Sequence, residues 1–365
     1  TCTGKDANSA AFEINNSDVT LTVKNGKVVS SQLVGLIPSA MGGTIKYDNS
    51  SLVFDGVVMT TTARSGIETN GNNTNDTVTL RNSTLNVPNG FGIYFPSSGT
   101  LTIDNSVINA KTMGVQVCAG SLNISGAGTA ITVSGDGIDK TINDGAIEDG
   151  AAISIVNRTG YKGLIAIKVE GGTFKANGTN AAVKAYDWDN TNKTESDFTQ
   201  AAKVSVSGGT FSSEVDKSLC AEGYIPTKNT DGTYGVKVGQ YVAEVNGAKY
   251  ATLAEAVAAA QDGQTVTLLA DATEDVVISK SITLNLGGKT LTNTNVGKAT
   301  ISVTSGTVTV KNGNVVGGTG YYNIEVTKNS NANLTLTDVT ATAGNNGSSM
   351  IDNWGTLTIE SGSYS

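Results

Sequence analysis

The chain has 365 residues, of which 44 are glycine, while only 15% are charged and 5% are aromatic. So few charged helix formers, beside many Thr, Asn, Ser and Val residues, predict an all-β fold. A net charge of −8 without a basic stretch excludes nucleic acid as an expected partner. The absence of histidine excludes His-based catalysis and His-ligated metals, and no apolar run is long enough for membrane insertion.

One pattern recurs along the chain: a strand of alternating apolar residues, a two-residue turn of Asn, Asp, Ser or Gly, and a second alternating strand. It occupies residues 21–29, 52–60, 78–86, 101–109, 167–175, 204–212, 308–316, 334–342 and 357–365. Neighbouring copies begin 23 residues apart (78 to 101) or 26 apart (308 to 334), and a third short strand, such as 92–95, lies between them. Repeats of this length predict a right-handed parallel β-helix whose rungs have three strands each.

The first segment that departs from the repeat is 29–42, which we expect to be a loop. It is unusually apolar for a loop, with Leu33, Leu36 and Ile37 in its centre. Two interpretations stay open. The segment packs on the flank of the coil, or it forms an exposed patch that serves as an interface with a partner.

A second predicted loop, 134–150, is acidic. Its carboxylates are Asp136, Asp139, Asp144, Glu148 and Asp149. Hard oxygen ligands at such spacings are suited to calcium, the one cofactor that the sequence suggests. They match no established calcium-binding pattern, so the alternative is a solvated acidic loop.

A third predicted loop, 186–199, combines aromatic and acidic residues. Tyr186, Asp187, Trp188, Asp189 and Phe198 give it the usual composition of a sugar-binding face. The alternative is that Trp188 folds back onto the coil as packing.

The repeat stops between residues 213 and 265. Asp231-Gly232 between apolar stretches predicts a hairpin. Helical spacing over 251–261, with a capping box from Thr252 and Glu255, predicts the only helix. We therefore expect a first β-helix at 1–218 without its own N-terminal cap, a closing hairpin or connector at 219–240, and a second β-helix at 241–365 with a capping helix.

At these residues the chain resembles known proteins. Residues 250–288, YATLAEAVAAAQDGQTVTLLADATEDVVISKSITLNLGG, are similar to the N-terminal cap of pectin-lyase-fold proteins. Residues 205–236, SVSGGTFSSEVDKSLCAEGYIPTKNTDGTYGV, resemble the β-helix repeats of large surface and adhesin-like proteins of gut Gram-positive bacteria. The resemblance implies an extracellular location at a bacterial cell surface. The polygalacturonases of this fold carry a Gly-His-Gly motif, which a chain without histidine lacks, so we expect no enzyme.

The expected function is that of a structural and adhesive module in an extended surface protein or filament, with a host glycan or a surface protein as partner. The alternative is a carbohydrate-binding or carbohydrate-active β-helix with its site near 186–199. Both solenoids look cut in mid-coil, and residues 357–365 followed by residues 1–21 would continue one coil in phase. We therefore expect self-association, as covalent tandem repeats or as chains stacked head to tail.

Overall fold

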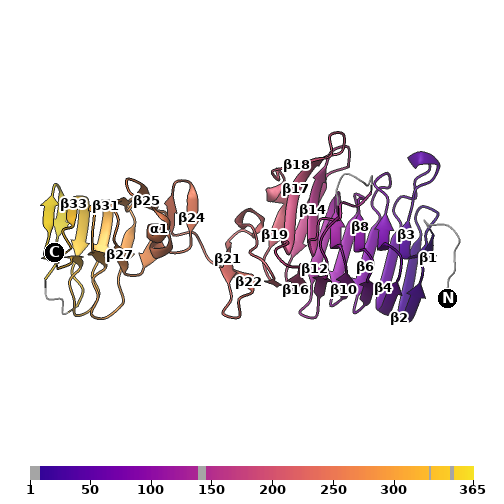
Figure 1. The fold of residues 1–365 in the computed structure, drawn as a ribbon, viewed down its shortest axis with the longest axis horizontal. Helices are drawn as coiled ribbons and strands as arrows, with labels where there is room; N and C mark the ends of the chain where they lie inside the picture. Colours follow the sequence, from indigo (N-terminus) through magenta and orange to yellow (C-terminus); the bar gives the residue numbers. More distant parts are fainter. Residues whose placement is uncertain (1–8, 139–144, 329, 346–348) are drawn as a thin grey trace. The chain divides into compact units, whose positions relative to one another are not determined.

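The computed structural model describes residues 9–138, 145–328, 330–345 and 349–365. The chain divides into two compact units, Thr1–Val238 and Gly239–Ser365, which are described separately. In both units the regular structure consists mainly of β-strands, most of them paired in parallel, as the composition predicts (Figure 1).

The first unit contains an eight-stranded and a fourteen-stranded sheet. The eight-stranded sheet comprises β1 (Ala10–Glu13), β3 (Leu33–Ile37), β5 (Ser65–Thr69), β8 (Phe91–Phe95), β11 (Met113–Val117), β14 (Ile153–Arg158), β17 (Val183–Asp189) and β18 (Thr194–Ser196). The fourteen-stranded sheet comprises β2 (Thr20–Ser30), β4 (Ser51–Thr61), β6 (Thr77–Arg81), β7 (Thr84–Val87), β9 (Thr100–Asp104), β10 (Val107–Ala110), β12 (Gly120–Ser125), β13 (Ala130–Val133), β15 (Leu164–Val169), β16 (Thr173–Lys175), β19 (Val204–Val206), β20 (Thr210–Phe211), β21 (Tyr224–Lys228) and β22 (Tyr234–Val238).

Successive coils of the first unit place equivalent strands side by side. Strands β6, β7 and β8 form one coil, and each pairs in parallel with its counterpart in the next coil, β9, β10 and β11. Thr77 pairs with Thr100, and the bonded pair Ser83 and Ser106 lies 23 residues apart. The predicted three-strand repeat with parallel pairing is therefore present. The antiparallel hairpin of β21 and β22 pairs with β20, so residues up to Val238 belong to this unit.

The second unit repeats the arrangement in a ten-stranded and a four-stranded sheet. The ten-stranded sheet comprises β23 (Ala243–Val245), β24 (Ala248–Tyr250), β25 (Thr265–Leu268), β26 (Ala272–Thr273), β28 (Thr283–Asn285), β29 (Thr290–Thr292), β31 (Thr307–Val316), β33 (Asn333–Thr342), β35 (Thr356–Ile359) and β36 (Gly362–Tyr364). The four-stranded sheet comprises β27 (Val276–Ile278), β30 (Ile301–Val303), β32 (Ile324–Val326) and β34 (Ile351–Asn353).

The predicted helix is confirmed as α1 (Leu253–Ala259), with the Thr252 and Glu255 capping box formed. Its buried side chains, Leu253, Ala256 and Val257, belong to the core of the second unit. In the parts of the chain that the structure describes, no helix is long and apolar enough to cross a membrane.

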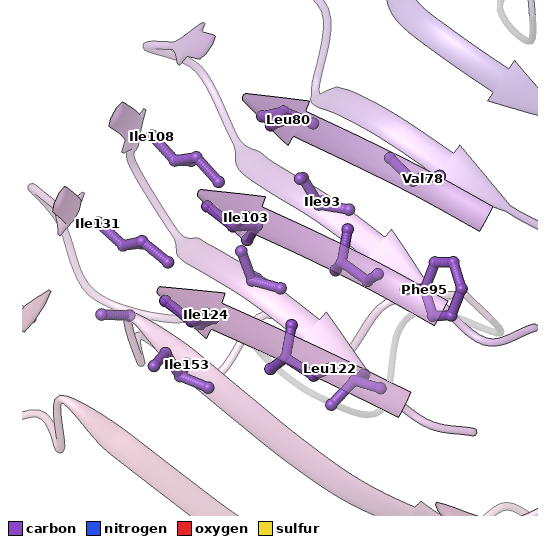
Figure 2. Close-up of a cluster of buried hydrophobic side chains, with 14 of the residues drawn as sticks. Val78, Leu80, Ile93, Phe95, Ile103, Ile108, Leu122, Ile124, Ile131 and Ile153 are labelled. Atoms are coloured by element: carbon purple, nitrogen blue, oxygen red, sulfur yellow. The ribbon is translucent and has the colours of Figure 1, made fainter. Parts of the chain in front are cut away.

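The core of each unit is a stack of apolar side chains that repeats from coil to coil. In the first unit Leu80, Ile103 and Ile124 lie at equivalent positions on β6, β9 and β12, facing Ile93 from β8 (Figure 2). These residues are at most 1% exposed. The turns between the paired strands use Asn82 and Asn105 with φ of 48° and 43°, as the Asn-rich pattern predicts.

The prediction of a loop at 29–42 is wrong. Strand β2 continues to Ser30, and Leu33–Ile37 forms strand β3 of the eight-stranded sheet. Leu33, Leu36 and Ile37 are 7%, 9% and 0% exposed, so they form no exposed interface patch. All five residues of β3 are buried because both faces of this sheet are covered, and the alternation that marks a half-buried strand is therefore missing.

Neighbouring coils approach each other closely at a row of glycines in the eight-stranded sheet. A Cβ added to Gly92 would lie 2.4 Å from the carbonyl oxygen of Gly114 and 2.7 Å from the side chain of Ile108. Gly66 and Gly114 face the next coil in the same way. The small residues thus let the third strand bend over the core.

We predict that Gly92→Ala lowers the free energy of unfolding of the first unit by about 1–3 kcal/mol, because the coils must move apart to admit the methyl group. Urea denaturation measures the change. The control is Gly26→Ala, where an added Cβ has nothing within 4 Å, and it should shift stability by less than about 0.5 kcal/mol. Equal stability of the two variants would contradict this packing.

A candidate ligand-binding groove

The outer face of the eight-stranded sheet carries one row of side chains in register across seven strands. The row consists of Glu13, Leu36, Glu68, Tyr94, Gln116, Ser154 and Lys184. Because the strands are parallel and their pairing is unbroken, residues far apart in sequence become neighbours here about 4.8 Å apart. This face is the most chemically varied surface of the first unit.

A short segment, Gly145–Asp149, crosses this row and is held by it. Gln116 pairs with the Ile147 backbone in both directions: its Nε2 donates to the Ile147 carbonyl oxygen at 2.7 Å, and its Oε1 accepts from the Ile147 N–H at 2.8 Å. Ser154 Oγ donates to Asp149 Oδ2 at 2.6 Å. We call Gly145–Asp149 the strap.

The strap buries an ion pair against the sheet. Glu148 is 2% exposed and accepts hydrogen bonds from Arg64 Nε, at 2.8 Å, and from the hydroxyl of Thr112. Arg64 also pairs with Glu148 through Nη2, while half of the Arg64 side chain stays exposed. Since a buried carboxylate without a partner would cost several kcal/mol, Arg64 and Thr112 fix the position of the strap.

Further along the same face, Arg158 ties a second set of groups together. Its Nη1 donates to Tyr94 Oη at 2.9 Å and to the Gly145 carbonyl oxygen, and its Nε donates to Asn190 Oδ1. Tyr94 Oη lies 2.8 Å from Tyr161 Oη. Cys118 is fully buried beside them, and burial raises the pKa of its thiol to about 12, so it remains a protonated, unpaired thiol.

The predicted loop at 186–199 is mostly a hairpin. Tyr186, Asp187, Trp188 and Asp189 lie on β17, which pairs antiparallel with β18. Tyr186 and Trp188 are each 2% exposed and pack edge to face in the cluster beneath the strap, with ring centroids 6.5 Å apart. With both rings buried, neither presents a face on which a sugar could stack, and Trp188 has the packing role that the sequence left open.

The remaining residues of this segment have structural partners. Asp187 accepts hydrogen bonds from the backbone and hydroxyl of Thr199. Bonds from Asn192 and from the Thr191 backbone lower the pKa of Asp189. Phe198 packs, partly buried, against the core.

We predict that Trp188→Ala lowers the free energy of unfolding of the first unit by about 3–5 kcal/mol, because it leaves a cavity among buried aromatic rings. Urea denaturation followed by circular dichroism measures this change. The matched control is Trp354→Ala, at a site that is 56% exposed, where a change within about 0.5 kcal/mol is expected. A small effect of Trp188→Ala would argue against the packing role.

The predicted calcium ligands are not gathered into one cluster by the described residues. Asp136 accepts from Asn177 and Asn180, Glu148 pairs with Arg64, and Asp149 accepts from Ser154 and the Ala151 backbone. Asp139 and Asp144 lie outside the described residues. Among the residues that the structure does describe, no group of three acidic, Cys or His side chains is placed to hold a metal ion.

The strap should depend on the amide of Gln116. We predict that Gln116→Leu destabilises the first unit by about 1–3 kcal/mol, because both backbone groups of Ile147 lose their partner in a buried place. Hydrogen exchange should show faster exchange at Ile147 than at the core strand β9. The exposed Gln261→Leu serves as the control, and unchanged exchange in both variants would contradict the role of Gln116.

Beside the strap, the same face forms a groove of about 670 Å³. Its floor contains Leu33, Leu36 and Phe91 from β3 and β8. One wall is the segment 38–47, which contributes Ser39 and Tyr47. The opposite wall is made by Ala63, Arg64, Gly145 and Ala146. Small-ligand sites usually combine apolar lining residues with a few polar groups in this way.

Polar groups reach into the groove from neighbouring strands. Glu13 and Glu68 flank Leu36 in the outer row, and Asn15 and Asn70 add amides. Burial raises the pKa of Glu68, while Ser65 and Arg64 lower it and Glu148 raises it further. Since Arg64 is already paired with Glu148, the groove is acidic overall.

Sequence reasoning missed most of this groove. Its carboxylates, Glu13 and Glu68, come from different coils and belong to no motif. The one available signal was the apolar run that contains Leu33 and Leu36, which line the groove floor instead of an exposed patch.

Comparison with known proteins adds no relative. No protein-family model matches the chain, and neither a curated protein nor a solved structure matches it significantly. The resemblance to pectin-lyase-fold surface proteins therefore stays a prediction.

Proposed function

We propose that the chain is a right-handed parallel β-helix that serves as a structural and adhesive module at a bacterial cell surface. Three features support this proposal: the three-strand coil, the parallel pairing between successive coils, and the resemblance at 205–236 and 250–288. A stack of coils is a stiff support, and segments that leave its strands can hold a ligand without moving the core.

The observation that carries the adhesive part is the groove beside the strap. Its floor is a hydrogen-bonded sheet, and its walls are held by the Arg64–Glu148 ion pair and by the Gln116 bonds to the strap. A site formed in advance loses little conformational entropy when a ligand binds. This rigidity suits adhesion better than a mobile loop would.

The chemistry of the groove favours a neutral or amino-bearing glycan. Glu13, Glu68 and Asn70 line the groove and offer acceptors for the hydroxyl groups of a glycan, while Leu33 and Leu36 beneath them keep only 7% and 9% of their surface exposed. The carboxylate of a uronic acid residue would be repelled by the two carboxylates of the groove, Glu13 and Glu68. The proposal is therefore one of binding to a host glycan, without catalysis.

End-to-end association is the second part of the proposal. On the outer edge of the second unit, Leu357 on β35 and Tyr364 on β36 are only partly buried, while Leu334 and Leu336 on β33 are buried. Pairing of β35 and β36 with a further coil, covalently linked or from a second copy, would cover these side chains. Such head-to-tail contacts extend into a filament.

Filling the groove tests its role. We predict that Ser39→Trp abolishes binding of the full chain to at least one neutral or amino-bearing oligosaccharide among those it captures on an array that also carries uronic acid glycans, because the indole occupies the space beside Leu36. Thr44→Trp is the matched control, since Thr44 lies in the same segment, is exposed and does not line the groove. Both variants should keep the parental melting temperature.

Loss of binding in Ser39→Trp alone supports the groove. Equal binding of every captured glycan by the parent and by both variants, or binding confined to uronic acid glycans, would overturn this assignment. Capture of no glycan by the parent chain would overturn the choice of ligand.

A further inference from the structure

A second surface with binding chemistry lies on the four-stranded sheet of the second unit. Val277, Ser302, Glu325 and Asp352 form one row in register across β27, β30, β32 and β34. Ser302 Oγ donates to Glu325 at 3.3 Å. The two carboxylates, Glu325 and Asp352, are thus adjacent on the last two strands of this sheet.

An exposed tryptophan stands at one end of the carboxylate pair. Trp354 follows β34 and keeps 56% of its surface exposed. Its Nε1 donates to Asp352 Oδ2 at 2.8 Å, and Lys328 Nζ lies 5.0 Å from its ring centroid. The hydrogen bond to Asp352 and the Lys328 ammonium over the ring orient the indole, while more than half of its surface stays exposed.

Two tyrosines stand at the other end. Tyr321 and Tyr322 precede β32, and their ring centroids are 4.7 Å apart with the planes at 59°. Partial burial and the Glu325 carboxylate, to which the Tyr321 hydroxyl is bonded, raise the pKa of Tyr321. Tyr321 and Trp354 are thus hydrogen-bonded to the neighbouring carboxylates Glu325 and Asp352, respectively.

Packing does not account for these three rings. The core of the second unit is complete with its aliphatic residues, and the partly buried side chains that pack against it include Tyr250 and Tyr364 but not Tyr321, Tyr322 or Trp354. The other tryptophan of the chain, Trp188, is buried. One exposed and two half-buried aromatic rings beside carboxylates, in a chain with only 5% aromatic residues, point to a ligand.

The distance between Trp354 and the two tyrosines indicates the kind of ligand. Trp354 follows Asn353, the register partner of Val326, so its Cα atom lies about five residues along the strand direction from that of Tyr322, or roughly 16 Å. A cage for a single ammonium group needs its rings within about 6 Å of one cation. Two aromatic ends separated by hydrogen-bond acceptors suit a chain of pyranose rings better, because aromatic faces stack on sugar C–H groups and carboxylates accept from hydroxyls.

We propose that Tyr321, Tyr322, Glu325, Asp352 and Trp354 form a binding site for a neutral oligosaccharide, which lies along the face with a ring stacked at each end and its hydroxyl groups on the two carboxylates. Glu325 and Asp352 outnumber Lys328, so the site disfavours uronic acid chains. It is separate from the groove of the first unit and does not depend on that assignment.

Trp354 gives this proposal a direct readout. The chain has two tryptophans, and Trp188 is buried, so a change in indole fluorescence on adding a glycan reports mainly on Trp354. The full chain is first screened on an array of neutral oligosaccharides of four to six residues. The best of these is then titrated in solution, beside hexagalacturonate and choline chloride.

We expect a neutral oligosaccharide to bind and to shift the fluorescence, with Trp354→Ala weakening binding at least tenfold and Trp354→Phe retaining part of it. Tyr322→Ala should weaken binding as well. Ser39→Trp, which fills the groove of the first unit, should leave this binding unchanged, so the two assignments fail independently. Binding of choline alone, or of hexagalacturonate in preference, or no oligosaccharide binding that depends on Trp354, would overturn the proposal.

Discussion

Parallel hydrogen bonding between successive coils is the constraint on which the rest of the structure depends. Once Thr77 pairs with Thr100, every following position of the two coils is aligned, including the inward pair Leu80 and Ile103 and the turn pair Asn82 and Asn105. A shift of one residue would turn the apolar side chains of a strand outward. The apolar stack therefore enforces the register, and the register in turn aligns whatever the chain carries on its outer faces.

The sequence predicts those parts of the fold in which one face is buried and the other is solvated. Strands such as β9 alternate threonine with leucine or isoleucine, Asn105 marks the turn, and Thr252 with Glu255 marks the start of α1. It does not predict β17 as a strand although the burial of that strand alternates, because the aromatic and acidic side chains of 186–189 are also typical of a binding loop. It does not predict β3 because all five residues of that strand are buried. Burial on both sides removes the alternation by which a strand is recognised.

The groove was out of reach of sequence reasoning for a different reason. Its carboxylates become neighbours only when coils of unequal length are stacked: Glu13 lies beside Leu36, and Leu36 beside Glu68. The strap reaches the same face from residue 145 onward, much further along the chain. To locate such a site from the sequence, one must know the length of every coil between the residues that form it. One misplaced strand, such as β3, changes which residues are predicted to be neighbours.

The sheets of third strands differ from the fourteen-stranded sheet in the connections beside their strands, and this difference explains where the candidate ligand-binding residues lie. Between the first and second strands of a coil the chain makes a two-residue turn, as at Asn82 and Asn105, which leaves no room for an inserted segment. The third strand is flanked by connections of variable length, and these supply the strap, the segment 38–47 and the Tyr321–Tyr322 pair. On the fourteen-stranded sheet the corresponding outward row runs through Thr79, Thr102 and Asn123, small polar residues that offer a flat, solvated surface. Aromatic rings and carboxylates thus accumulate on the sheets of third strands. Only next to these strands can an inserted segment form the wall of a groove, or place an aromatic ring beside a row of side chains aligned by the coils.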